Sequence, residues 1–161
     1  MVPQKALAKL QLQCSRREYC CGQIRQRLLR WSGKEKSSGK VGYSATEIEE
    51  VISSLVADKF IDDARFADAY VRDKARFSKW GSVKIAYNLK KLGVESSVVE
   101  AALRNNAGCF GCEELVELLK RKYGTLKEDE PWARKREKLL RFALQRGFEY
   151  GQIMDVINEF R

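Results

Sequence analysis

Two clusters of basic side chains in this chain are candidates for binding phosphate groups. The first cluster is Arg16, Arg17, Arg25 and Arg27, and the second cluster is Arg134, Lys135, Arg136, Lys138, Arg141 and Arg146. Arginine suits phosphate because its planar guanidinium donates two parallel hydrogen bonds, and lysine adds a compact positive charge. Both clusters therefore predict contact with nucleic-acid phosphates, although about half of such charge runs are only solvated helix faces.

The net charge of +9 is unevenly distributed along the 161 residues. Residues 1–40 carry ten basic and two acidic side chains, a balance of +8. Residues 41–119 carry ten and thirteen, a balance of −3, and residues 120–161 carry eleven and seven, a balance of +4. Positive ends favour a polyanionic partner, nucleic acid above all, whereas the acidic middle is poorly suited to lie against phosphates.

The residues that most enzymes use are missing or wrongly spaced. There is no histidine, which excludes Ser–His and Cys–His nucleophile pairs. The stretch 33–40 has the wrong glycine spacing for a phosphate loop and follows a predicted helix instead of a strand. Cys109 and Cys112 form a lone CxxC without the second ligand pair of a zinc site, and Asp62-Asp63 is typical of a helix cap. We therefore expect a protein without catalytic activity, cofactor or metal.

The elements that must position the basic clusters follow one pattern, which occurs three times. Each copy has an apolar i, i+4 pair, a glycine before a large apolar residue, and a second apolar set at helical spacing. The pairs are Ile24/Leu28, Ile85/Leu89 and Leu139/Ala143, the glycines are Gly42, Gly93 and Gly147, and the second sets are Ile48/Val51/Ile52, Val99/Ala102/Leu103 and Ile153/Val156/Ile157. The pattern predicts helix, glycine stop and helix in each copy, and we expect Gly93 and Gly147 in the left-handed conformation that ends a helix.

Nearly every periodic segment is helical in pattern, so we expect an all-α fold of tandem three-helix repeats with about nine helices. The predicted repeats are 1–58, 59–107 and 108–161. The first copy aligns with the others only if residues 32–41 form an insertion, which its Gly, Ser and Lys content predicts to be a mobile basic loop.

Helix starts are indicated by capping residues. Ser15 with Glu18 and Ser44 with Glu47 have the spacing of capping boxes, in which each residue caps the other's backbone. Asp62 or Asp63 is expected to cap the helix that follows. On this interpretation the helix that begins at Ser15 carries the whole first basic cluster.

No segment is apolar enough to span a membrane, and Lys5 and Lys9 interrupt the apolar residues at the N-terminus. The five cysteines then indicate ordinary reduced thiols. We therefore expect a cytoplasmic protein.

Several segments, in order along the chain, resemble the RecX family of regulatory proteins. They are Arg17-Glu18-Tyr19 with Ile24 and Leu28, then 60–67 (FIDDARFA), then Gly81 with Ile85, Leu89 and Gly93, and finally 138–142 (KLLRF) with Arg146-Gly147-Phe148. The resemblance extends from about Ala6 to Phe160. Its most specific parts are the DDxRFA segment and the closing RGF. The insertion at 32–41, and a cysteine at position 20 or 21, depart from the family pattern.

The resemblance implies a modulator of the RecA recombinase in DNA repair, homologous recombination and the SOS response. It also implies a curved, elongated array of three-helix units that lies along the groove of the RecA–DNA filament and hinders ATP hydrolysis and strand exchange. The partners would be the RecA filament and single- and double-stranded DNA, and the chain would be a monomer. The alternative is a free-standing helix-turn-helix DNA-binding or architectural protein, which would act on naked duplex.

Overall fold

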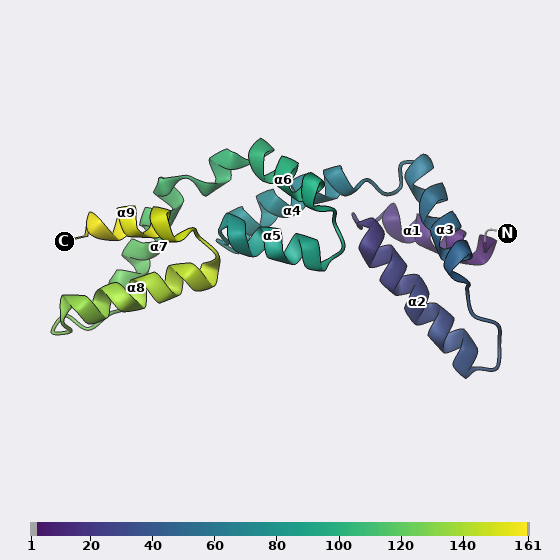
Figure 1. Ribbon diagram of the computed structural model, residues 1–161, viewed down its shortest axis with the longest axis horizontal. Helices are drawn as coiled ribbons and strands as arrows, with labels where there is room; N and C mark the ends of the chain where they lie inside the picture. Colours follow the sequence, from purple (N-terminus) through teal and green to yellow (C-terminus); the bar gives the residue numbers. More distant parts are fainter. Residues whose placement is uncertain (1–2, 161) are drawn as a thin grey trace. The chain divides into compact units, whose positions relative to one another are not determined.

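The computed structural model describes residues 3–160, and within that range it contains nine α-helices, one short 3₁₀ helix and no strand. The helices follow one another as three groups of three, which confirms the all-α fold of three-helix repeats (Figure 1). The repeat boundaries 1–58, 59–107 and 108–161 stay predictions, and their outermost residues, 1–2 and 161, lie outside the described residues. None of the helices in the described range is long and apolar enough to cross a membrane.

Apart from α2, the bounds of the helices agree closely with the periodic segments of the sequence. The first group is α1 (Gln4–Cys14), α2 (Cys21–Ser37) and α3 (Ala45–Ala57), and the second group is α4 (Asp63–Phe77), α5 (Ser82–Lys91) and α6 (Ser96–Asn105). The 3₁₀ helix Ala107–Phe110 precedes the third group, which is α7 (Cys112–Tyr123), α8 (Trp132–Arg146) and α9 (Tyr150–Asn158).

The chain forms two compact units, and the second group of helices is divided between them. The N-terminal unit comprises the chain up to Ala67 together with Lys90–Val98. The C-terminal unit comprises Asp68–Leu89 together with the chain from Val99 onward. A core in the N-terminal unit contains the apolar residues of the first copy of the pattern, and a core in the C-terminal unit contains those of the third copy.

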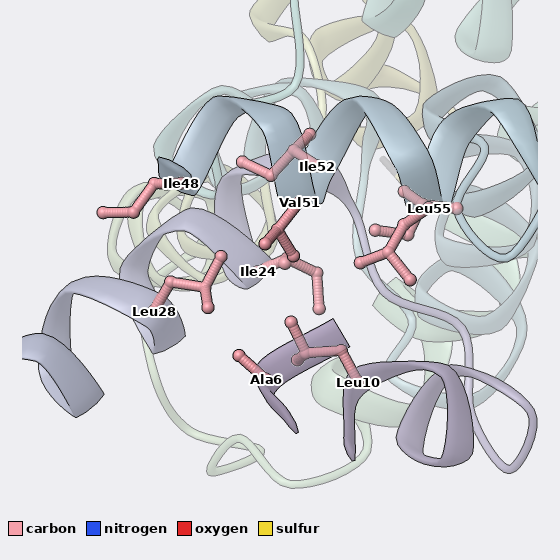
Figure 2. Close-up of a cluster of buried hydrophobic side chains, with 9 residues drawn as sticks. Ala6, Leu10, Ile24, Leu28, Ile48, Val51, Ile52 and Leu55 are labelled. Atoms are coloured by element: carbon pink, nitrogen blue, oxygen red, sulfur yellow. The ribbon is translucent and has the colours of Figure 1, made fainter. Parts of the chain in front are cut away.

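The core of the N-terminal unit is built by α1, α2 and α3. Figure 2 shows side chains of α2 and α3 directed toward one another, with those of α1 beside them. Its buried residues are Ala6, Leu10, Ile24, Leu28, Ile48, Val51, Ile52, Leu55 and Ile61. Burial of each large aliphatic side chain contributes about 1.5–3 kcal/mol. This core therefore fixes which face of α2 is left for solvent.

The core of the C-terminal unit joins α7, α8 and α9. It consists of Leu115, Leu119, Leu139, Ala143, Phe148, Ile153, Val156 and Ile157. Leu139 and Ala143 lie on α8 and are fully buried. Because they are one helical turn apart, they turn one face of α8 inward, and the exposed Arg134, Lys138 and Arg141 lie on the other side of the helix.

Both expected left-handed glycines are confirmed. Gly93 and Gly147 have φ angles of +91° and +88° at the ends of α5 and α8. The prediction of a glycine stop at Gly42 is wrong, because α2 ends at Ser37 and the chain turns at Gly39, whose φ angle is +75°. Gly42 comes after that turn and lies close to the Ser32 side chain.

The expected loop at residues 32–41 is also corrected, because α2 continues to Ser37. Lys34, Glu35 and Lys36 are good helix formers, and they extend the helix beyond its core-facing part. The buried Ser32 hydroxyl donates a hydrogen bond to the Tyr43 carbonyl at 3.2 Å, which holds the returning chain against the helix.

One capping box is confirmed and the other is wrong. Ser44 Oγ accepts a hydrogen bond from Glu47 N at 3.2 Å, and Ser44 N donates to Glu47 Oε2 at 2.9 Å. These bonds with Ser44 lower the pKa of Glu47. Ser15 instead continues the end of α1, where its backbone N–H donates to the Gln11 carbonyl, and α2 begins only at Cys21. The capping box of α2 is formed by Cys20 and Gln23.

Candidate nucleic-acid interface

Helix α8 carries the second basic cluster, and its members differ in what they contact. Arg134 and Arg136 are exposed near the start of the helix, where Arg136 NH2 lies 3.7 Å from Met154 Sδ. Arg141 pairs with Glu137 one turn before it, and both side chains are about 64% exposed. Exposed pairs of this kind contribute less than about 1 kcal/mol, so phosphate can compete for the Arg141 guanidinium.

The remaining members of the second cluster serve the local structure. Lys138 Nζ lies 2.6 Å from Glu130 Oε1, and this hydrogen bond lowers the pKa of Glu130. Lys135 Nζ donates to the Glu128 carbonyl at 3.1 Å. Arg146 is half-buried, and its NH1 donates to the Ser78 carbonyl at 2.8 Å. Arg146 therefore joins the end of α8 to the segment between α4 and α5.

The first basic cluster is divided between a turn and a helix. Arg16 and Arg17 lie between α1 and α2, not on α2 as the misplaced helix start implied. Arg25 makes a bidentate ion pair with Glu49, in which Nε donates to Oε1 at 2.8 Å and NH2 donates to Oε2 at 3.0 Å. This pairing raises the pKa of Arg25. Of this cluster, Arg16 and Arg17 are the exposed members.

Tyr19 brings two arginines of the first cluster to one place. The guanidinium carbons of Arg17 and Arg27 lie 5.5 Å and 4.9 Å from the centre of its ring. Arg27 also hydrogen-bonds Gln13 through NH1. Cations over an aromatic face are attracted by its quadrupole, so Tyr19 concentrates positive charge at the turn between α1 and α2.

The DDxR segment, which the sequence indicated only as a helix cap, ties α4 to the start of α2. Asp62 Oδ1 accepts from Arg65 N at 3.0 Å and caps α4 as expected. Asp63 Oδ1 accepts instead from Cys21 N at 2.8 Å, at the first residue of α2. Arg65 donates to both carboxylate oxygens of Glu18 at 2.8 and 3.2 Å. Sequence reasoning missed this link because its partners are about 42 to 47 residues apart along the chain.

The end of one helix also meets the start of another at two places, one in each unit. In the C-terminal unit, Gly81 N donates to the Arg146 carbonyl at 2.7 Å and Val83 N donates to the Gly147 carbonyl at 3.0 Å. In the N-terminal unit, Cys20 Sγ lies 3.4 Å from the Leu92 carbonyl. Carbonyls at a helix end carry partial negative charge, and amides at a helix start carry partial positive charge, so the junction in the C-terminal unit is favourable.

Comparison with known proteins identifies the family. The model for the second three-helix domain of RecX matches residues 62–103, and the model for its third three-helix domain matches residues 112–157. A regulatory protein RecX from Pelodictyon phaeoclathratiforme is 33% identical over 73% of this chain and 71% of its own length. This chain belongs to the RecX family.

Other RecX proteins are similar over the same region. Those of Clostridium tetani and Clostridium botulinum are 31% and 34% identical over 73% of this chain. The chain spans about half the length of these relatives, 54% and 55%. A crystal structure of RecX from Lactobacillus salivarius has the same fold, with a TM-score of 0.79 at 23% identity over 97% of this chain and 94% of that chain.

The cysteine thiols of this RecX-family chain differ in burial and in pKa. No cluster of three metal-ligating side chains occurs within residues 3–160. Cys20 is buried at the junction with Leu92, and burial raises its pKa. Burial, together with the charge and hydrogen bond of Asp63, raises the pKa of Cys21 to about 12. Cys112 is exposed at the start of α7.

These differences predict an order of thiol reactivity. At pH 8 a thiol of pKa about 12 has about one molecule in ten thousand as thiolate, which is the reactive form. A maleimide pulse followed by peptide mass spectrometry should therefore label Cys112 at least tenfold faster than Cys21. Equal labelling of the two in the folded protein would contradict the structure, whereas equal labelling after denaturation is the expected control.

Proposed function

We propose that this chain regulates the RecA recombinase by binding RecA–DNA filaments and inhibiting RecA-dependent ATP hydrolysis. Membership of the RecX family supports the proposal, and the observation that carries it is the distribution of charge. Arg134, Arg136 and Arg141 are three exposed cations of α8, while residues 41–119 have a balance of −3. Exposed cations attract phosphates over about one Debye length, roughly 8 Å in physiological salt.

The proposed arrangement uses both signs of charge. The basic residues near the two ends of the chain contact DNA, and the acidic middle contacts the recombinase. An acidic surface pressed onto duplex would be repelled by the phosphates, whereas a filament offers protein and DNA together. The proposal includes the three repeats at the predicted boundaries. It also includes a monomeric protein that acts in the cytoplasm.

The decisive experiment measures RecA-dependent ATP hydrolysis on single-stranded DNA with increasing amounts of this protein. We expect inhibition at amounts well below one protein per RecA, because one bound regulator can interrupt a filament of many subunits. Adding the protein before or after filament assembly separates blocked growth from disassembly. An unchanged ATPase rate with excess protein would refute the proposal, and salt-dependent binding to naked duplex would then favour the free-standing DNA-binding protein.

A further inference from the structure

A small cavity in the N-terminal unit is lined by residues that belong to neither basic cluster. It has a volume of about 310 Å³, which lies at the lower end of the range of about 300–1,000 Å³ for ligand pockets. It opens between α1, α2 and the segment before α3. Its side chains are three lysines, two aromatic residues and one carboxylate: Lys5, Lys9, Lys34, Trp31, Tyr43 and Glu35.

The cavity selects for negative charge. Lys5, Lys9 and Lys34 are exposed, so their ammonium groups can move toward a ligand with little loss of solvation. The single carboxylate, Glu35, is already engaged by Lys40, with Nζ 3.6 Å from Oε2. A ligand therefore meets three cations and one carboxylate that already has a lysine partner.

The aromatic side chains give the cavity a flat wall. Trp31 and Tyr43 are partly buried and pack against the core of the unit, which holds both rings in place. Lys9 Nζ lies over the Trp31 ring at 4.5 Å from its centre. The ammonium of Lys9 thus covers the indole face that is turned toward α1, and because this side chain is exposed it can move aside for a planar group.

The cavity exists because α2 is longer than the corresponding helices. Lys34 and Glu35 belong to residues 32–41, which the second and third copies of the sequence pattern lack. Helix α2 has 17 residues, whereas α5 has 10. The insertion therefore adds a wall that the equivalent part of α5 does not have.

We propose that this cavity binds one unstacked nucleotide of single-stranded DNA, with the base on the Trp31 ring and the lysines on the neighbouring phosphates. Stacking on an aromatic side chain requires a base whose face is open, which a single strand provides and a duplex does not. The inference rests on the proposed function, because it names where the regulator contacts the single strand of a filament. The inference gives the insertion a role in DNA binding that is separate from the two basic clusters.

The test uses binding to naked DNA, without recombinase. In a Trp80→Phe/Trp132→Phe protein, Trp31 is the one remaining tryptophan of the three in the chain. Titration with an oligothymidylate of about 12 nucleotides, within the usual site size, should quench its emission to saturation. Anisotropy of a labelled oligonucleotide with otherwise unmodified protein gives the affinity independently of these substitutions.

The matched variants separate this cavity from general charge. Lys5→Gln, Lys9→Gln and Lys34→Gln together should weaken oligonucleotide binding about 10- to 100-fold and reduce the log–log salt slope by about 2. The control removes the same charge at Lys90, Lys91 and Lys127, which are exposed elsewhere, and should lose less than about threefold. Circular dichroism on both variants checks that they are folded.

Several results would overturn the inference. Unchanged Trp31 emission at saturating oligonucleotide would refute stacking, and equal losses in the two lysine variants would refute the site. Equal quenching by duplex DNA or by thymidine monophosphate would show that the cavity is not specific for single-stranded DNA. Inhibition of the RecA ATPase with no Trp31 quenching refutes only this site, whereas quenching without inhibition refutes only the regulatory function.

Discussion

The substitution Gly22→Ala is expected to destabilise the protein, whereas Gly33→Ala in the same helix is expected to stabilise it. Alanine normally replaces glycine in a helix with a gain of about 0.5–1 kcal/mol, because glycine loses more backbone entropy on folding. A Cβ at Gly33 would have nothing within 4 Å. A Cβ at Gly22 would lie 2.1 Å from the Leu92 carbonyl oxygen and 2.9 Å from Gly93 Cα.

The clash at Gly22 is with backbone atoms, which cannot rotate away as a side chain can. Overpacking of this kind costs about 1–3 kcal/mol, which exceeds the helix-propensity gain. The two variants should therefore lie on opposite sides of the wild type in urea unfolding followed by circular dichroism. Protection of α2 amides in hydrogen exchange locates the effect. Equal stabilisation by both substitutions would mean that α2 does not meet the end of α5 at Gly22.

Reversing Arg134, Arg136 and Arg141 to Glu is expected to abolish most of the inhibition of the RecA ATPase. Six units of charge change at three exposed positions of α8, and phosphates that were attracted are then repelled. Each phosphate contact contributes about 0.7–0.9 to the log–log salt slope. The amount of protein needed for half-maximal inhibition should therefore rise by about tenfold or more, and most strongly at low salt.

The fold of this variant should persist, because the buried face of α8 is unchanged. Arg141 loses its pair with Glu137, but both side chains are exposed and such pairs are weak. The matched control reverses Lys90, Lys91 and Arg104, which are exposed outside α8. If the control weakens inhibition as much as the α8 variant, the effect is one of net charge and the three α8 arginines are not the contact. Arg146 is left out of both variants because it holds the Ser78 carbonyl.

The helices were predictable from the sequence because their signals are local. Apolar spacing of three and four residues placed Leu139 and Ala143 in the core, and both are fully buried. The reciprocal cap of Ser44 and Glu47 needs only residues three positions apart. The predictions that failed rested on local patterns that a more favourable interaction in the folded chain overrides. Ser15 resembled a cap, but its amide already continues α1.

The insertion shows the same competition. Glycine and serine at residues 32–41 indicated a loop, yet the helix formers among them extend α2 to Ser37. The buried hydrogen bond from Ser32 to Tyr43 adds a tertiary contribution that composition does not show. The cavity beside Trp31 could not be predicted for this reason, since it requires Lys34 to be helical and close to α1.

The basic clusters were visible in the sequence, but their members were not distinguishable. The ten side chains all carry one positive charge and have similar spacing, and the structure gives them different contacts. Arg25 is held by Glu49 and Arg146 by the Ser78 carbonyl, while Arg134 stays exposed. Which cation is held depends on side chains that are distant along the chain.

The sequence by itself determined the helical repeats, the left-handed turns at Gly93 and Gly147, the uneven charge and the resemblance to the RecX family. These depend on backbone sterics, on periodicity and on composition, which act over a few residues or over the whole chain. Only the tertiary structure decided that Asp63 binds the start of α2, that Gly22 must lack a side chain, and that Trp31 faces three lysines. The physical reason is that each of these depends on a contact between segments whose separation in space no local pattern records.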